Sequence, residues 1–195
     1  MDALDLLDWR RRVAGLYREV RRCDPVAGHA RWFAGREELL RYHPQSPIPP
    51  ARRASFRLRV APYDPAFRFV VPVLPAEALR TSVATGDGVV HQDRIGRVEL
   101  PGLGTLDLWW VAVYGGGVFL PVRDATSGST GYGGGRYVLD TVKGADLGGG
   151  RDDLVVDLNF AYPPSCAYDE AWSCPLPGPG NRLDAPVPVG EQGPG

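Results

Sequence analysis

The sequence predicts a mainly β fold of the α+β class: an antiparallel β-barrel or sandwich of about eight or nine strands, with two N-terminal helices and an extended C-terminal strap rich in Pro and Gly. Apolar residues recur at helical spacing up to about residue 42, and they alternate with polar residues from about residue 56 onward, as in strands. No helical pattern interrupts the alternating region, so the parallel crossovers of a nucleotide-binding sheet are not expected.

Two helices are expected at the N-terminus. The first covers residues 4–22, where acidic residues occupy the first turn and arginines the last, in keeping with the helix dipole. The second begins at Asp24-Pro25, which supplies an N-cap and a first-turn proline. It should end by Tyr42, because Pro44 cannot continue a helix.

Short alternating segments follow a proline-dense linker, residues 43–50, which we expect to be extended. Turn residues such as Gly86-Asp87-Gly88 separate several of these segments. The candidate strands are residues 56–60, 67–73, 79–85, 89–92, 94–100, 105–114, 118–122, 137–142 and 154–160.

The chain is expected to form one structural domain with three parts. Residues 1–43 are a helical segment packed on the sheet, residues 44–162 the antiparallel β domain, and residues 163–195 a strap that frays after about Gly190. A chain of 195 residues with 44% hydrophobic content can bury a core of this kind.

Charge and composition argue against several classes of function. A net charge of −1 and a pI near 6.3 provide no positive field for a nucleic acid. No apolar run approaches membrane-spanning length, and Asp2, Asp5 and Asp8 interrupt any signal sequence, so we expect a cytoplasmic protein. No metal or cofactor is expected, since the cysteines and histidines lack zinc-site spacing. Cys166 and Cys174 are then reduced thiols, or a disulfide if the compartment is oxidising.

The last two candidate strands suggest a polar site. Alternation places Asp157 and Asn159 on one face of residues 154–160, and Arg136 lies at the start of the preceding strand. If the two strands pair as a hairpin, Arg136 could reach Asp157. The three side chains would then bind a ligand carboxylate or phosphate, or form an internal ion pair.

The glycine-rich loop of residues 126–135 does not match a familiar catalytic motif. It has no Gly-Lys-Ser/Thr ending, and a strand rather than a helix is expected after it, so it is not a phosphate loop. Ser127 is not in a Gly-x-Ser-x-Gly elbow, and a serine nucleophile would need a histidine from elsewhere in the chain.

Five phrases are specific enough to carry a family resemblance. They are FLPVRDATSG at 119–128, YGGGRY at 132–137, DLNFAY at 157–162, CAY at 166–168 and SCPLP at 173–177. With them the chain resembles a large bacterial and archaeal family known only as a domain of unknown function. The resemblance implies a shared site around Arg136, Asp157, Asn159 and Tyr162. In the stretch GPGNRL at 178–183, Gly180 stands where the family has a glutamate, and Pro163 replaces an asparagine.

We expect the β domain to bind a small polar or anionic molecule. Arg136 would clamp the anion, Asp157 and Asn159 would orient it, and other polar or aromatic side chains would line the pocket or cover its mouth: Tyr132, Tyr162, Arg123, Asp124, Ser127, His43 and Ser46. One alternative is a hydrolase or lyase in which Asp157 or His43 is the base. The other is a structural or partner-binding protein whose polar residues only hold the strap in place.

Overall fold

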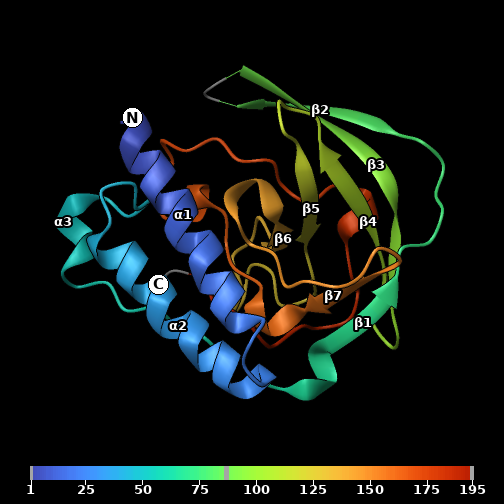
Figure 1. The fold of residues 1–195 in the computed structure, drawn as a ribbon, viewed down its shortest axis with the longest axis horizontal. Helices are drawn as coiled ribbons and strands as arrows, with labels where there is room; N and C mark the ends of the chain where they lie inside the picture. Colours follow the sequence, from blue (N-terminus) through green and yellow to red (C-terminus); the bar gives the residue numbers. More distant parts are fainter. Residues whose placement is uncertain (1, 86–87, 194–195) are drawn as a thin grey trace.

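The computed structural model describes residues 2–85 and 88–193, and its two long helices lie together on one side of the molecule (Figure 1). Helix α1 (Ala3–Val20) is capped by Asp2, which accepts from the amide of Leu4, and helix α2 (Pro25–Tyr42) is capped by Asp24. The helices approach closely at Gly35, where an added Cβ would lie 2.8 Å from Leu16 of α1. Both helices were predicted from the sequence.

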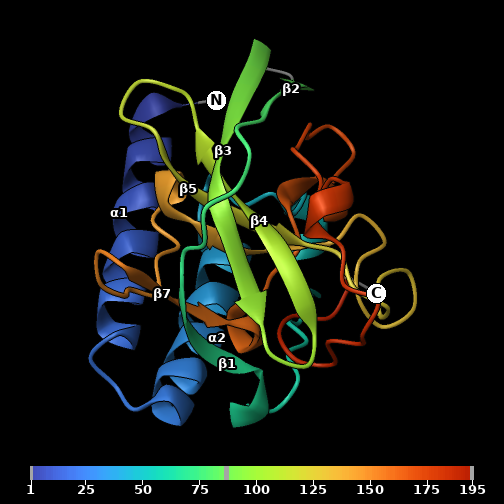
Figure 2. The same ribbon diagram turned by 90° about the vertical axis from the view of Figure 1, so that its right-hand side faces the viewer.

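The strands form two antiparallel sheets. Within the described residues these strands are β1 (Arg68–Pro72), β2 (Arg80–Thr85), β3 (Gly88–Leu100), β4 (Gly104–Val111), β5 (Gly117–Val122), β6 (Arg136–Asp140) and β7 (Asp153–Asp157). One sheet has the order β2-β3-β4-β5-β6, and the other pairs β1 with β7. Strands β2 and β3 extend together beyond the rest of the sheet (Figure 2).

Of the two predicted architectures, barrel or sandwich, the barrel is wrong. Strands β2 and β6 are the two edges of the five-stranded sheet, and they do not pair with each other. The class is α+β, with two long N-terminal helices and two antiparallel sheets that do not close into a barrel.

Two differences account for the smaller number of strands. Residues 56–60 contribute only a single bridge, between Val60 and Glu191, because the neighbouring chain continues as loop. The segments 89–92 and 94–100 belong to one strand, β3, which passes through a bulge between Arg94 and Gly96 where its register with β4 shifts. The predicted turn at Gly86-Asp87 lies outside the described residues.

The predicted hairpin between residues 137–142 and 154–160 is also wrong. Strand β6 pairs with β5, and β7 pairs with β1; the chain after β7 meets β6 at one isolated bridge, Tyr137 to Tyr162, which lies beyond residue 160. Strand β7 ends at Asp157, whose carboxylate accepts from the amide of Asn159 at 3.0 Å and caps the 3-10 helix η3 (Leu158–Phe160). The strand geometry that would place alternate side chains on one face therefore ends at Asp157 and does not include Asn159.

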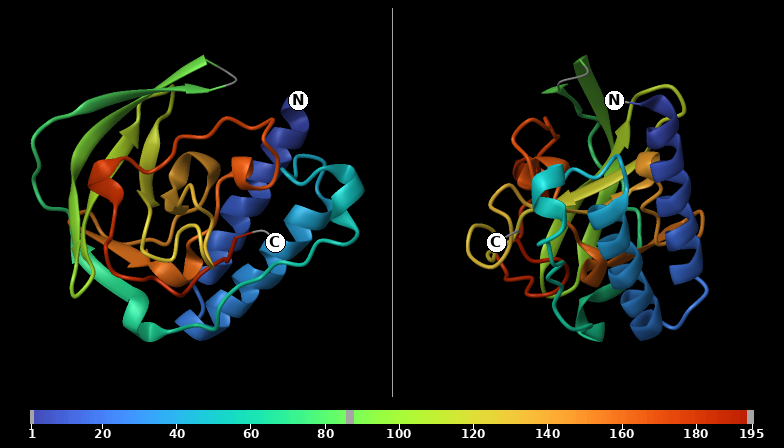
Figure 3. Two further views of the ribbon diagram at one scale, coloured as in Figure 1. Left: turned by 180° about the vertical axis from the view of Figure 1, so that it is seen from behind. Right: turned by 90° about the vertical axis from the view of Figure 1, so that its left-hand side faces the viewer.

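The C-terminal segment runs extended across the back of the sheet (Figure 3). Its backbone pairs with distant parts of the chain: the amide of Leu183 donates to Arg123 at 2.8 Å, and the amide of Glu191 donates to Ala161 at 2.8 Å. Glu191 is 1% exposed. Beyond Gly190, the amides of residues 191–193 donate hydrogen bonds to the backbone of other segments.

Short helical turns complete the structure. They are α3 (Pro50–Arg53), η1 (Pro65–Phe67), η2 (Thr141–Lys143), η4 (Ser165–Ala167) and η5 (Pro179–Asn181). The main core contains side chains from α1, α2, both sheets and the strap, including Leu16, Trp32, Leu120, Val156 and Val187. In the described part of the chain, no helix is both long and apolar enough to cross a membrane.

Candidate functional site

Arg136 is completely engaged in the protein interior. Its guanidinium lies 2.9 Å from the carboxylate of Asp124 and donates to three backbone carbonyls of the strap, those of Val187, Val189 and Glu191. Asp124 also accepts from the amide and hydroxyl of Thr126. Burial raises the pKa of Asp124, but the Arg136 charge and the hydrogen bonds from Thr126 outweigh it and hold that pKa below its ordinary value.

Asp157 and Asn159 form a separate cluster. The Asn159 amide group donates to Asp157 and to the backbone of Asp64, each at 2.8 Å, and the Tyr63 hydroxyl donates to Asp157 at 3.1 Å. Burial raises the pKa of Asp157, and its hydrogen bonds from Asn159 and Tyr63 oppose this effect.

The expected contact between Arg136 and Asp157 is therefore wrong. Arg136, Asp157 and Asn159 are 3%, 1% and 0% exposed, and each has its hydrogen-bonding groups satisfied by other parts of the chain. The prediction failed because it required a hairpin that the chain does not form. Both clusters fix loops and the strap to the sheets.

The other predicted site residues are dispersed. Ser127 accepts from the Asp124 amide at 3.2 Å, Arg123 is exposed beside them, and the Tyr132 hydroxyl lies 3.7 Å from the Cys166 sulfur. At the end of α2, the His43 ring contacts Asp8 at 3.1 Å, and the Ser46 hydroxyl donates to the Leu40 carbonyl. Burial raises the pKa of Tyr132 to about 12. Of the predicted residues, Tyr162 lines the cavity described next.

A cavity lies between the two long helices and the chain that follows β6. We call it the helix–sheet cavity; its volume, as space open to the centre of a water molecule, is ≈ 70 Å³. Such a volume holds several water molecules or part of a small organic molecule. Most lining residues are aromatic or apolar: Trp9, Val13, Leu16, Tyr17, Trp32, Leu39, Leu40, Pro47, Tyr137, Ala145, Tyr162, Pro163, Pro164 and Tyr168, with Arg36, Asp140, Lys143 and Ser165 as the other polar residues.

Arg36, which lines the helix–sheet cavity, belongs to a buried ion pair. The Arg36 guanidinium lies 2.5 Å from the carboxylate of Glu191, and it also donates to the Tyr168 hydroxyl at 3.1 Å. The guanidinium carbon is 4.4 Å from the centre of the Tyr162 ring, a distance typical of a cation–π contact. The Arg36 charge is thus already balanced within the protein.

Asp140 is the acidic residue in the lining of the helix–sheet cavity. The residue is 5% exposed, and although it occupies the N-cap position of η2, its carboxylate makes no capping hydrogen bond. Its ion pair is with Lys143 at 3.7 Å, which is beyond hydrogen-bonding distance, and the Lys143 side chain is 50% exposed. This carboxylate lines the cavity and can accept a hydrogen bond from a group that enters it.

The tyrosines of the helix–sheet cavity are neutral. Burial raises the pKa of Tyr17, Tyr137 and Tyr162, and the nearby Asp140 carboxylate adds to this effect in each case. These hydroxyls are therefore hydrogen-bonding groups without charge.

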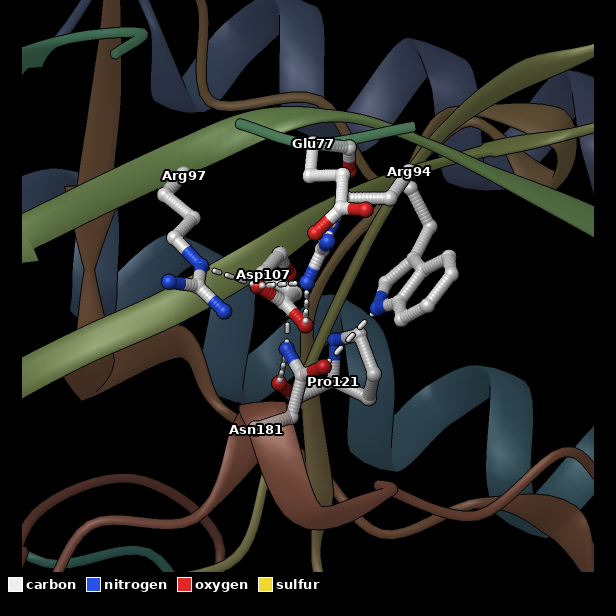
Figure 4. A network of polar contacts seen from close by, with 7 residues as sticks. Glu77, Arg94, Arg97, Asp107, Pro121 and Asn181 are labelled. Atoms are coloured by element: carbon white, nitrogen blue, oxygen red, sulfur yellow. Dashed lines mark hydrogen bonds and ion pairs between the residues drawn. The ribbon is translucent and has the colours of Figure 1, made fainter. Parts of the chain in front are cut away.

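A second polar network surrounds Asp107 on β4 (Figure 4). Its carboxylate binds Arg97 at 2.6 Å and Arg94 at 3.2 Å, and the Asn181 amide group donates to the backbone carbonyls of Asp107 and Pro121. The network fixes η5 to the sheet.

The Asp107 network also surrounds Gly180, the position at which the resemblance implies a glutamate. A Cβ placed on Gly180 would lie 2.0 Å from the Asp107 carboxylate, so a side chain at position 180 and this carboxylate compete for one space. Although the chain has Gly180 where a glutamate was expected, a carboxylate from β4 lies at that position.

Sequence reasoning missed the polar residues of the helix–sheet cavity. Arg36 had a signal: it follows Trp32 by four residues on the face of α2 that also carries Leu39 and Leu40, so a charge occupies an apolar stripe. Asp140 had none, because an acidic residue at the end of a strand is usually exposed.

No group of three or more metal-binding side chains occurs among residues 2–85 and 88–193. Cys23, Cys166 and Cys174 are free thiols, and the Cys166 amide lies 3.4 Å from the Cys174 sulfur. Burial raises the pKa of Cys174.

Comparisons with known proteins identify a family. No curated protein matches the chain. The chain is similar to an uncharacterised protein of Haloarcula marismortui, solved by NMR in solution, with 34% identity, a TM-score of 0.58, and coverage of 82% of this chain and 89% of that one. A family model described as a protein of unknown function (DUF1684) matches residues 55–192. Since the match covers more than half of the sequence, the chain belongs to the DUF1684 family.

Proposed function

We propose that the protein binds a small molecule in the helix–sheet cavity, with an apolar or aromatic body against the rings and a polar end near Asp140. The observation that carries the proposal is a cavity with mostly apolar and aromatic walls, lined also by a carboxylate that makes no capping hydrogen bond. Small-molecule sites in proteins have this composition: mostly apolar walls with a few placed polar groups.

The charges of the cavity favour a polar ligand over an anionic one. Arg36 is the buried cation, and Glu191 at 2.5 Å already neutralises it. Lys143 is paired with Asp140 and half exposed. An anion would therefore have to compete with a carboxylate for either cation, whereas a hydrogen-bond donor would satisfy Asp140 directly.

The hydrolase or lyase alternative has little geometric support at its proposed bases. Asp157 is 1% exposed and holds hydrogen bonds from Asn159 and Tyr63. His43 is 4% exposed, and both ring nitrogens are engaged, one by Asp8 and the other by the amide of Gln45. A substrate could reach neither group without rearrangement of the chain.

A fragment screen by ligand-observed NMR tests the proposal. Val13 of α1 lines the cavity and is half-buried, so the larger ring of Val13→Trp should fill the space. Arg11→Trp places the same ring on an exposed part of α1 and serves as the control. Fragments should bind the wild type and the control but not Val13→Trp. The proposal fails if no fragment binds the wild type, or if all binding persists in Val13→Trp.

A further inference from the structure

We infer that the polar end of the ligand is a protonated amine and that Asp140 is its counter-ion. This inference rests on the proposed function and specifies the chemistry of the same cavity. It depends on how few interactions the Asp140 carboxylate makes, on the rings that surround it, and on the position of Lys143.

The Asp140 carboxylate has few partners within the protein. The residue is 5% exposed, its side chain makes no capping hydrogen bond, and Lys143 is the cation within ion-pair distance of it in the described part of the chain. Its oxygens can therefore accept hydrogen bonds from a group that enters the cavity. An ammonium group in the cavity would donate charge-assisted hydrogen bonds to these oxygens, which are stronger than those from a neutral hydroxyl.

The walls of the helix–sheet cavity suit a cation as well. Tyr17, Tyr137 and Tyr162 line the same cavity as Asp140, and the Asp140 charge contributes to raising the pKa of each. The negative faces of such rings attract a cation. Arg36 does not repel it strongly, because Glu191 balances the Arg36 charge and Tyr162 covers the guanidinium.

Lys143 occupies the place that the ligand would take beside Asp140. Its ammonium is 3.7 Å from the carboxylate, and half of its side chain is in solvent, so it can move away from Asp140 at small cost. A ligand ammonium would therefore replace one cation by another and leave the net charge of the cavity unchanged. Removal of Lys143 should strengthen amine binding.

Three small molecules of similar length separate the possible head groups: n-butylamine, 1-butanol and butyrate. Their dissociation constants for the wild-type protein can be measured by NMR titration near neutral pH. We expect n-butylamine to bind about tenfold more tightly than 1-butanol, since one charge-assisted hydrogen bond contributes about that factor, and butyrate to bind most weakly.

Two variants with opposite expected effects complete the test. Asp140→Asn should weaken n-butylamine binding about tenfold and leave 1-butanol nearly unchanged, whereas Lys143→Ala should tighten n-butylamine binding. Lys143 is half exposed, so its variant is expected to fold even if Asp140→Asn does not.

Three results would contradict the amine inference. They are equal binding of 1-butanol and n-butylamine, stronger binding of butyrate than of n-butylamine, and weaker amine binding in Lys143→Ala. If none of the three molecules binds but screened fragments bind in a Val13-dependent manner, the cavity stands as the site and only the amine is wrong. If nothing binds at all, the proposed function fails with it.

Discussion

The guanidinium of Arg136 lies 2.9 Å from the carboxylate of Asp124, and 3% and 0% of the two side chains are exposed. Asp124 belongs to the loop after β5, Arg136 begins β6, and Arg136 also donates to the carbonyls of Val187 and Val189. One buried ion pair thus connects the glycine-rich loop, the sheet and the strap. The pair that resembled a ligand clamp in sequence is a structural connection.

Loss of Arg136 should strongly destabilise the protein. Arg136→Ala leaves the Asp124 carboxylate buried without its partner, and removing one member of a buried pair costs about 3–5 kcal/mol. The free energy of unfolding from urea titration measures this effect. Arg31→Ala is the control, since it breaks an exposed pair with Glu19 whose loss should cost less than about 1 kcal/mol. Equal losses in the two variants would contradict the structural role of Arg136.

The local sequence pattern predicted most of the helices and strands but not which strands pair with each other. The caps at Asp2 and Asp24 and the alternation in β1 through β6 depend on neighbours in sequence, and these elements appear close to their expected bounds. The pairing of β7 with β1 depends on residues about 85 apart in sequence, and no local pattern specifies it. Because the site was derived from a wrong pairing, Arg136 and Asp157 were placed together.

The helix–sheet cavity was hidden from sequence reasoning for a similar reason. Arg36 comes from α2, Asp140 from the end of β6, and Tyr168 from the strap, so the cavity exists only after three distant segments pack. The carboxylate of Glu191 binds Arg36, which explains why a charged residue near the terminus is buried.

Stability should fall in mild acid because of His29. Burial lowers the pKa of His29 from its ordinary value of 6.5, while its contact with the Asn159 carbonyl opposes this effect. The folded state therefore prefers the neutral ring. The His29 contribution to stability is complete above the unfolded-state pKa, and it is lost as the pH falls through that value toward the lower folded-state pKa.

Urea titrations between about pH 5 and about pH 8 can isolate this contribution. His29→Gln retains a donor toward Asn159 but cannot titrate, so its stability should change less over this range than that of the wild type. His91→Gln alters an exposed histidine that contacts Ser82, and its curve should run parallel to the wild type. A His29→Gln curve as steep as the wild-type curve would assign the acid sensitivity to other groups.

Position 180 should not accept a side chain while Asp107 is present. In Gly180→Ala the new Cβ would overlap the Asp107 carboxylate at 2.0 Å and displace it from Arg94 and Arg97. We expect a loss of about 1–3 kcal/mol in the free energy of unfolding, as for other overpacked sites. Gly178→Ala is a matched control, because its Cβ would meet no atom within 4 Å. If both variants were equally stable, the Asp107 carboxylate could move without cost.

The C-terminal Glu191 should be essential for stability although it lies four residues from the end of the chain. Glu191→Ala leaves Arg36 charged and unpaired at a side-chain exposure of 11%, and the expected loss is about 3–5 kcal/mol. Gln192→Ala, which removes a hydrogen bond from exposed Arg59, should change stability by less than about 0.5 kcal/mol. A chain that ends at Gly190 should lose at least as much unfolding free energy as Glu191→Ala, because it also lacks the hydrogen bond from the Glu191 amide to the Ala161 carbonyl. Thermal and urea unfolding of the three variants measure these differences. If truncation at Gly190 left stability unchanged, neither the Arg36 ion pair nor the backbone pairing of the strap would contribute to the fold.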